Sequence, residues 1–329
     1  MAQRVQILKR AVVPQEPSVQ FLTSGGTILD LILGGGWGLG RVANIVGDKS
    51  SGKTLLAIEA CANFARAFST QIAYRETEAA FDLPYARSMG MPSCVDWGNP
   101  EEPLRTVEDL ERDLTAWLDK QSAKTPSLYI VDSLDALSSE AELKREVGEG
   151  TYGQEKPKAM SKMFRALIRT IEHKNCCVLI VSQIRDKIGV TFGETKTRSG
   201  GRALDFYSSQ VVWLSELKKI SRVHTGVTRV VGVEVLARNK KNKLGRAYRQ
   251  GEFSILFNYG VDDEQSMLDW LKKNKGEHML PEGNKWYREA RRNRERETVE
   301  GVRAELRNAV VARWEEIEDA LAPSMSKYE

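Results

Sequence analysis

Short strand-like runs alternate with longer amphipathic segments along the first two thirds of this chain. The runs lie at residues 42–46, 71–75, 128–131 and 176–182. Each ends beside a glycine or a polar residue and suits a strand that is buried on both faces. Between them, apolar residues recur every three or four positions, as on the buried face of a helix. This alternation predicts an α/β fold, with a mostly parallel central sheet flanked by helices.

The amphipathic segments predict three long helices and one short helix. The first follows residue 52 and is rich in alanine, without a proline. The second covers residues 106–122, and the third is marked by apolar residues between 160 and 171. The short helix covers residues 27–33 and runs directly into three glycines.

Composition divides the chain into three regions. Residues 1–20 are polar and proline-punctuated, and they form an arm that either pairs with a neighbouring subunit or is a loose terminus. Residues 21–260 hold the predicted sheet and its helices. Residues 261–329 predict a small, mainly helical C-terminal domain. Arginines and glutamates alternate at 288–297 in this last region, which fits DNA contact and an exposed salt-bridged helix equally well.

The overall composition is that of a globular protein without membrane segments. Of the 329 residues, 41% are hydrophobic and 29% are charged, and no apolar stretch approaches the length of a membrane span. The four cysteines lack C-x-x-C spacing, so we expect reduced thiols and a cytoplasmic location, which is the host cytoplasm if the source is a virus. The net charge of +4 is too small to indicate a polyanionic partner by itself.

A phosphate-binding motif lies between the first strand-like run and the first helix. It fits G-x-x-x-x-G-K-[ST] at each fixed position and consists of Gly47, Asp48, Lys49, Ser50, Ser51, Gly52, Lys53 and Thr54. The glycines let backbone N–H groups surround a phosphate, Lys53 reaches the β- and γ-phosphates, and the Thr54 hydroxyl can hold Mg²⁺. A turn that only capped a helix would need neither the lysine nor the threonine. The motif therefore predicts binding of ATP with Mg²⁺.

Polar residues follow the next three strand-like runs. Glu78 follows the second run, Asp132 ends the third, and Gln183 follows the fourth. A single acid in such a place is often a turn former or a helix cap. Because all three come after a complete phosphate loop, we predict that Glu78 is the general base, Asp132 a member of the Mg²⁺ shell, and Gln183 the γ-phosphate sensor.

Residues 21–258 resemble the RecA family of homologous-recombination ATPases. The resemblance is carried by five blocks, at 34–54, 78–87, 130–133, 183–193 and 199–207. It implies a phosphate-loop ATPase core of the RecA type. It also implies that Glu78 is the catalytic glutamate, that Ser133 belongs to the nucleotide site beside Asp132, and that Asp82 and Tyr85 contact adenine. Core packing is the alternative role for Tyr85.

Two glycine-containing segments match the places where the family contacts DNA. They lie at 146–157 and 185–202, and the second has five basic residues against two acids. The resemblance implies DNA contacts by Tyr152, Lys158, Ser161, Arg165, Arg185, Phe192, Gly200, Gly201 and Arg202. The sequence departs from the family at Asp186, at Lys196 and in the length of the first segment, so the details of DNA contact stay open.

A basic bias marks residues 218–249, which contain ten lysines or arginines and the single acid Glu234. Within it, Lys241 and Lys243 match paired lysines of the family. The resemblance implies that these two lysines reach across a subunit boundary to the ATP of the neighbour. A solvated basic face or a DNA-facing flank is the alternative.

Taken together, these features predict a DNA-dependent ATPase that forms helical filaments on single-stranded DNA and promotes homologous pairing and strand exchange. The expected partners are single-stranded and double-stranded DNA, further copies of the chain, and single-strand-binding or mediator proteins. The alternatives are a hexameric RecA-fold DNA helicase or motor, and a filament-forming module that does not hydrolyse ATP. The module is disfavoured because Lys53, Thr54, Glu78 and Asp132 are all present.

Overall fold

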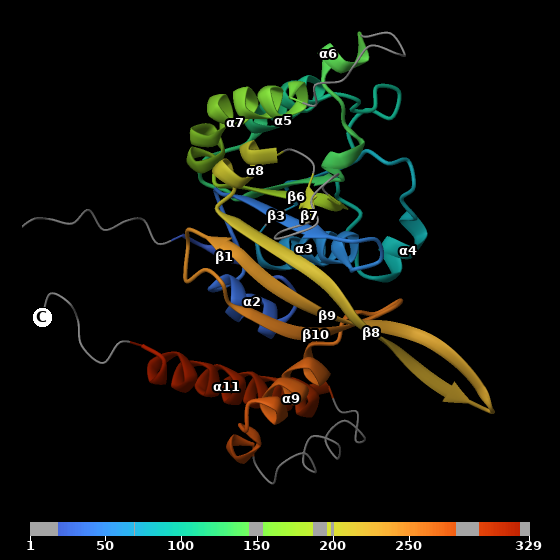
Figure 1. Ribbon diagram of the computed structural model, residues 1–329, viewed down its shortest axis with the longest axis vertical. Coiled ribbons are helices and arrows are strands. Elements are labelled where there is room, and N and C mark those ends of the chain that lie inside the picture. The colour runs from blue at the N-terminus through green and yellow to red at the C-terminus, as the bar shows by residue number, and fades with distance from the viewer. Residues whose placement is uncertain are drawn as a thin grey trace, which may run out of the picture.

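A large twisted sheet forms the centre of the protein (Figure 1). The computed structural model describes residues 19–68, 70–144, 154–186, 196–198, 201–280 and 296–322. In this part of the chain the sheet has nine strands, eight of them in the order β11-β10-β9-β8-β3-β6-β5-β4, while β7 pairs with β6. The strands are β3 (Val42–Gly47), β4 (Ile72–Glu76), β5 (Ser127–Asp132), β6 (Cys176–Asp186), β7 (Lys196–Arg198), β8 (Gln210–His224), β9 (Val227–Asn242), β10 (Gln250–Leu256) and β11 (Gly260–Val261).

The strands from β4 to β8 are parallel to their neighbours, and those beyond β8 are antiparallel. The four runs read from the sequence are the parallel strands β3, β4, β5 and β6, and β8 adds a fifth beside β3. The predicted α/β class is confirmed. Because parallel strands end at one edge, the segments after β3, β4, β5 and β6 meet there.

Helices cover both faces of the sheet. One face carries α5 (Val107–Lys120), α7 (Glu155–His173) and α8 (Gly201–Tyr207), and the other carries α2 (Thr27–Leu33) and α3 (Lys53–Ala67) (Figure 1). Successive residues of β5 pack on opposite faces of the sheet. Leu128 and Ile130 belong to the apolar cluster on the α3 side, while Tyr129 and Val131 belong to the one on the α5 side. This period of two is that of a strand buried on both faces.

Among the predicted long helices, α5 shows most clearly how the local sequence forms a helix, because a side chain caps its start and its apolar residues share one side. The Thr106 hydroxyl accepts a hydrogen bond from the Asp109 N–H, and the Asp109 carboxylate accepts one from the Thr106 N–H, which makes a capping box at the start of α5. The helix then buries Val107, Leu110, Leu114, Trp117 and Leu118. Shorter elements complete this half, namely α4 (Leu83–Ser88), η1 (Leu134–Ala136), α6 (Glu140–Leu143) and the strand pair β1 (Phe21–Leu22) and β2 (Trp37–Gly38).

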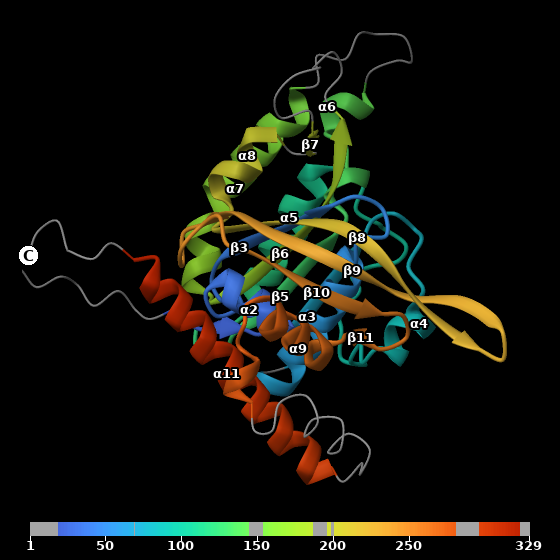
Figure 2. The same cartoon turned by 60° about the horizontal axis from the view of Figure 1, so that its bottom comes forward.

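Strands β8 and β9 form a long hairpin that extends beyond the rest of the sheet (Figures 1 and 2). The two strands are 15 and 16 residues long. Strand β10 pairs with β9 only as far as Gly232, so the residues beyond it have no third strand. We call residues 220–232 the hairpin arm. The sequence showed the basic bias of this segment but not its length or its projection.

The C-terminal helices pack on the same apolar cluster as the sheet. These are α9 (Asp263–Lys273), the short η2 (Glu277–Met279) and α11 (Arg296–Ala320). Met267, Leu271, Leu306 and Val310 are buried in the cluster that also holds α2 and α3. In the part of the chain that the structure describes, no helix has the length and apolar character needed to cross a membrane.

Candidate nucleotide site

The phosphate loop connects β3 to α3 and has the backbone shape that its glycines allow. Gly52 has φ of 88°, a conformation that residues with a side chain rarely adopt. A Cβ at Gly52 would lie 2.3 Å from Ile255 Cδ1, and one at Gly47 would lie 2.3 Å from Ser51 Oγ. The loop is held closed by the Ser51 hydroxyl, which donates to the Asp48 carbonyl at 2.8 Å. The glycines thus allow a tight, closely packed loop between β3 and α3, and its binding of phosphate stays a prediction.

Lys53 is the first residue of α3, and its side chain folds back over the loop. The Lys53 Nζ atom donates to the Asp48 carbonyl at 2.7 Å. Burial lowers the pKa of this ammonium, while the nearby carboxylates of Asp132 and Glu78 act in the opposite direction. A buried ammonium group beside the loop can donate charge-assisted hydrogen bonds to a phosphate oxygen.

Asp132 ends β5, and two hydroxyl groups hold its side chain. The Tyr74 hydroxyl of the adjacent strand β4 donates to Asp132 Oδ2 at 2.7 Å. Burial raises the pKa of Asp132, and the hydrogen bonds from Tyr74 and Thr54 counteract this rise. One carboxylate therefore touches the threonine of the phosphate loop, as the prediction for the Mg²⁺ shell requires.

The two acids after β4 have different environments. The Glu76 carboxylate accepts hydrogen bonds from the backbone N–H groups of Glu78, Ala79 and Ala80, at 2.8, 3.0 and 3.3 Å. Glu76 therefore shapes the loop, and its oxygens are occupied. Glu78 is exposed, and its carboxylate faces the Ser133 hydroxyl, which donates to it. Of the two acids, Glu78 is the one that is accessible to a water molecule.

Gln183 lies on β6, a third strand that reaches the carboxylate of Glu78. Its Nε2 atom donates to Glu78 Oε1 at 2.7 Å. Its backbone N–H donates to Asp135 Oδ2 at 2.6 Å, so η1 fixes the position of the residue. The structure thus joins the predicted base and the predicted γ-phosphate sensor by a direct hydrogen bond.

A cavity of about 410 Å³ lies beside the phosphate loop. Asp82 and Tyr85 line it, opposite Val233, Ile255 and Phe257 from the β9 and β10 side. The Asp82 carboxylate caps α4 by accepting a hydrogen bond from the Tyr85 N–H at 2.9 Å. Tyr85 also packs against the core cluster, and its contact with adenine stays a prediction.

The residues present fit ATP with Mg²⁺. Mg²⁺ is usually held by one or two carboxylates together with substrate phosphates, and Thr54 and Asp132 supply one hydroxyl and one carboxylate in contact. Among the described residues, no group of three or more histidine, cysteine, aspartate or glutamate side chains is placed to hold a metal ion. The phosphate loop, the buried lysine and this donor pair together suit a nucleoside triphosphate with its cation.

Lys241 and Lys243 lie away from the phosphate loop of their own chain. Near the start of β3, Ala43 pairs with Gln210 of β8, which in turn pairs with Asn242 of β9. At the end of β3, where the phosphate loop begins, Gly47 pairs with Leu214 of β8, which in turn pairs with Ala237 of β9. The lysines are therefore at the other end of β3, about 13 Å along the strand direction. Both ammonium groups donate to carbonyls at the end of α8, with Lys243 at 3.4 Å from the Phe206 oxygen.

The predicted DNA residues are only partly within the described chain. Lys158, Ser161 and Arg165 lie on α7 at a spacing that places them on one side of the helix, and Lys158 and Arg165 are exposed. The others lie outside the described residues or have side chains that do: Tyr152, Arg185, Phe192, Gly200, Gly201 and Arg202. The same is true of most of the predicted N-terminal arm.

Two members of the site were not predicted. Tyr74 and Asp135 have no motif of their own, and each acts on a predicted residue from a different strand or turn. Tyr74 had one signal in the sequence, because a tyrosine inside a buried strand needs a hydrogen-bond partner. The identity of its partner depends on which strand lies next to β4, and the sequence pattern does not specify that neighbour.

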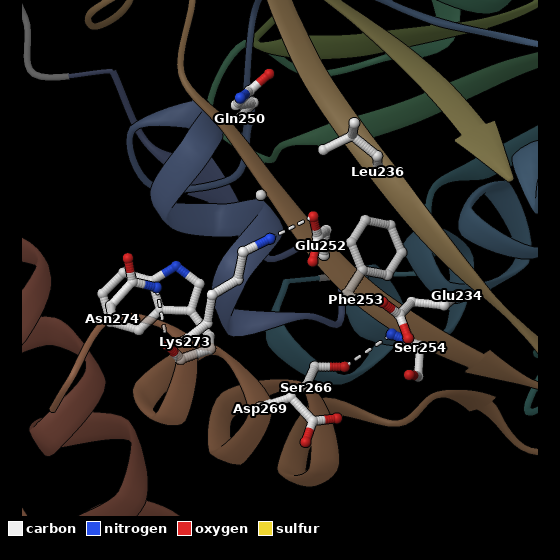
Figure 3. Close-up of a pocket in the computed structure, with 12 residues that line it drawn as sticks. Glu234, Leu236, Gln250, Glu252, Phe253, Ser254, Ser266, Asp269, Lys273 and Asn274 are labelled. Atoms are coloured by element: carbon white, nitrogen blue, oxygen red, sulfur yellow. Dashed lines mark hydrogen bonds and ion pairs between the residues drawn. The ribbon is translucent and has the colours of Figure 1, made fainter. Parts of the chain in front are cut away.

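A second cavity, of about 230 Å³, lies between β9, β10 and α9 (Figure 3). Two of its carboxylates are paired with lysines. Lys273 binds Glu252 at 2.6 Å, and Lys218 binds Glu234 at 2.7 Å. The first pair fastens α9 to the sheet and the second fastens the base of the hairpin. None of the predicted site residues lines this cavity.

Comparison with known proteins agrees with this geometry. The model of the RecA N-terminal domain matches residues 6–262. Protein RecA of Bordetella avium (strain 197N) is 34% identical over 261 residues, which cover 77% of this chain and 69% of that protein. Protein RecA of Chlamydia trachomatis serovar L2 is 35% identical over 258 residues, which cover 76% and 68%.

The fold also resembles a solved structure. The crystal structure of the RadB recombinase aligns with a TM-score of 0.53 and 19% identity, covering 73% of this chain and 98% of that one. At this identity the likeness concerns the fold alone, while the sequence matches establish the family. The chain therefore belongs to the RecA family of recombination ATPases.

Proposed function

We propose that this protein is an ATP-dependent homologous recombination protein. It forms helical filaments on single-stranded DNA and catalyses homologous pairing and strand exchange, with DNA-stimulated ATP hydrolysis. The observation that carries the proposal is the hydrogen bond from Gln183 to Glu78. It connects the strand that leads into the predicted second DNA segment with the predicted catalytic carboxylate.

ATP and Mg²⁺ supply the phosphoryl group to be cleaved and the cation that balances its charge. The chain then has three tasks. Lys53 and the loop N–H groups bind the phosphates, and Asp132 with Thr54 holds the cation shell. Glu78 accepts a proton from the attacking water, because of the three acids Glu76, Glu78 and Asp132 it is the exposed one.

Gln183 is the element that lets DNA and ATP influence one another. Two ligands are coupled when both bias the same two-state element. Gln183 either donates to Glu78, as here, or turns to the γ-phosphate and leaves Glu78 to the water. Because β6 continues from Gln183 to Asp186, DNA bound to the following segment shifts the choice between these two arrangements.

Lys241 and Lys243 complete the ATP site of a neighbouring copy. Their place at the other end of β3 from the phosphate loop supports action between subunits rather than within one. Two ammonium groups at an interface stabilise developing phosphate charge, as an arginine finger does. Filament formation on DNA would thereby turn on hydrolysis, in the cytoplasm where we place the protein.

Phosphate release with and without single-stranded DNA tests the proposal. We expect ATP hydrolysis to rise when DNA is added, and helical filaments to be visible by electron microscopy. Gln183→Ala should keep ATP binding and reduce the stimulation by DNA. An equal rate of hydrolysis with and without DNA would refute the proposed coupling. Closed hexameric rings would instead favour the motor alternative.

A further inference from the structure

Lys156 is a buried lysine in the first turn of α7. Its side chain is 8% exposed, and its Nζ atom donates to the Leu134 carbonyl at 2.8 Å. Lysines are rarely buried, because the ammonium group then loses its water. A cation is also unfavourable at the N-terminal end of a helix, where the helix dipole is positive. The stability of α7 therefore does not explain this lysine.

The Lys156 ammonium does not face the predicted DNA surface. Lys156 falls within the segment at 146–157 that was matched to DNA by resemblance, and the side chain of Lys158, two residues later, is 67% exposed. The Lys156 side chain instead reaches inward to η1, the short turn that follows β5. Its positive charge is therefore available to η1 and not to a DNA strand.

The turn η1 and the residue before it hold both the predicted base and the predicted sensor. On one side of Leu134, the Ser133 hydroxyl donates to the Glu78 carboxylate. On the other side, Asp135 Oδ2 accepts a hydrogen bond from the Gln183 N–H at 2.6 Å. Glu78 and Gln183 are also joined directly, at 2.7 Å. The position of Leu134 thus decides where these two side chains lie.

The hydrogen bonds within this turn are long. The Ala136 nitrogen lies 3.4 Å from the Ser133 carbonyl oxygen, and the Leu137 nitrogen lies 3.3 Å from the Leu134 carbonyl oxygen. Ordinary N–H···O hydrogen bonds measure about 2.9–3.0 Å. The bond from the Lys156 ammonium is shorter, at 2.8 Å, and charge-assisted bonds are also stronger. Lys156 therefore holds Leu134 more firmly than the turn holds itself.

We propose that Lys156 is a positioning residue for ATP hydrolysis. It fixes η1, and η1 fixes the geometry of Glu78 and Gln183. The described residues that line the nucleotide cavity do not include Lys156, so it acts through the turn and not on ATP. The proposal deepens the proposed function and rests on it for the reaction and for the role of Glu78. It is separate from the coupling assigned to Gln183, because it enters the site from α7 and not from β6.

The test compares three variants of the full-length protein. Lys156→Met keeps the aliphatic stem and removes the ammonium group, while Lys156→Arg keeps a cation with hydrogen-bond donors. The matched control is Lys174→Met, because Lys174 Nζ also donates to a backbone carbonyl, that of Gln121 at 2.7 Å, at the other end of α7. Phosphate release over a range of ATP concentrations, with and without single-stranded DNA, gives kcat and KM for each variant.

We expect Lys156→Met to lower kcat about tenfold, while KM for ATP and the affinity for single-stranded DNA stay within about twofold of the wild type. A misplacement of about 1 Å can slow an enzyme by about 100-fold, and here the hydrogen bonds of Ser133 and Asp135 limit the shift. Lys156→Arg should recover part of the rate, and Lys174→Met should match the wild type.

Thermal unfolding separates positioning from a structural role. The unfolding temperature of Lys156→Met should be equal to that of the wild type or higher, because replacing a buried charge by an apolar group is often neutral or stabilising. A variant that is slower but no less stable has lost geometry at the site and not its fold. A clearly lower unfolding temperature would identify Lys156 as a structural residue and overturn the proposal.

A double-mutant cycle asks whether Lys156 acts through Glu78. Lys156→Met should slow the Glu78→Gln protein by less than about twofold, because the carboxylate that it positions is already lost. An equal loss of rate in both backgrounds would overturn the proposal, and so would a kcat of Lys156→Met equal to that of Lys174→Met.

Failure of the proposed function looks different. The wild type would then hydrolyse ATP at one rate with and without DNA, and the effect of Lys156 on that rate would still be measured. A wild type that does not hydrolyse ATP would overturn both inferences.

Discussion

Replacing Tyr74 by phenylalanine would isolate the contribution of one hydroxyl to the nucleotide site. The change removes the 2.7 Å hydrogen bond to Asp132 from a residue that is fully buried. The ring stays in place, because it packs against Phe81 and Trp97 with centroids 5.1 and 5.3 Å away. Asp132 is only 7% exposed, so water does not readily replace the lost donor.

The expected cost follows from this burial. A hydrogen bond to a charged group contributes about 1.5–3 kcal/mol, and Asp132 keeps its contact with Thr54. We therefore expect Tyr74→Phe to lower the free energy of unfolding by about 2 kcal/mol. Tyr129→Phe is a matched control, since that buried tyrosine donates to Asp113 at 2.6 Å.

The control should cost less. The Asp113 carboxylate keeps Arg75 at 2.8 Å, and its side chain is 26% exposed, so solvent can take the place of the hydroxyl. We expect a loss of about 0.5–1 kcal/mol from this variant. Urea unfolding of both variants beside the wild type measures the difference.

A second readout separates the site from general stability. If Asp132 serves the Mg²⁺ shell, Tyr74→Phe should raise the Mg²⁺ concentration needed for half-maximal ATP binding several-fold. ATP binding without Mg²⁺ should be unchanged, and Tyr129→Phe should behave as the wild type in both assays. Equal destabilisation by the two variants, together with equal Mg²⁺ dependence, would refute the reasoning.

Three further predictions concern the general base, the two lysines that act between subunits, and a fluorescence change on ATP binding. Glu78→Gln should slow ATP turnover by roughly 10²-fold or more and keep ATP and DNA binding, because only the general base is lost. Changing Lys241 and Lys243 to alanine should abolish most DNA-stimulated hydrolysis. Mixing this variant with Lys53→Ala should restore part of it, because the Lys53→Ala copy supplies the two lysines and the double variant supplies an intact phosphate loop. Trp97→Phe should remove most of the change in tryptophan fluorescence on ATP binding, because the Trp97 ring lies 5.2 Å from that of Phe81, which lines the nucleotide cavity.

Each of these has a clear contrary result. Near-normal hydrolysis by Glu78→Gln would reassign the base. Normal DNA-stimulated hydrolysis by the double lysine variant would leave those residues as part of a basic face. A full fluorescence response without Trp97 would show that another tryptophan senses the nucleotide.

The features that the sequence predicted are those encoded by neighbouring residues. The phosphate loop, the helix expected over residues 106–122 and the acid at the end of β5 all depend on residues within one strand, loop or helix. Parallel strands also place their following segments at one edge, so the meeting of Glu78 with Gln183 follows from the alternation of strands and helices.

The features that it did not predict depend on which elements become neighbours. The contact between Tyr74 and Asp132 needs β4 beside β5 in a register that pairs Glu76 with Asp132. The hairpin arm needs β10 to stop at Gly232 while β9 continues. Both are properties of pairing between distant segments, and a local pattern of apolar residues does not contain them.

The packing of α9 and α11 on the sheet has a consequence for where the smallest folding unit ends. The family match stops at residue 262, but Met267, Leu271, Leu306 and Val310 fill the same core as α2 and α3. Arg303 and Glu318 add ion pairs to Glu264 and Arg249 across this contact. A fragment cut at the family boundary would leave a large apolar surface in water, and such surfaces promote aggregation. A minimal ATPase made from this chain must therefore keep its last long helix.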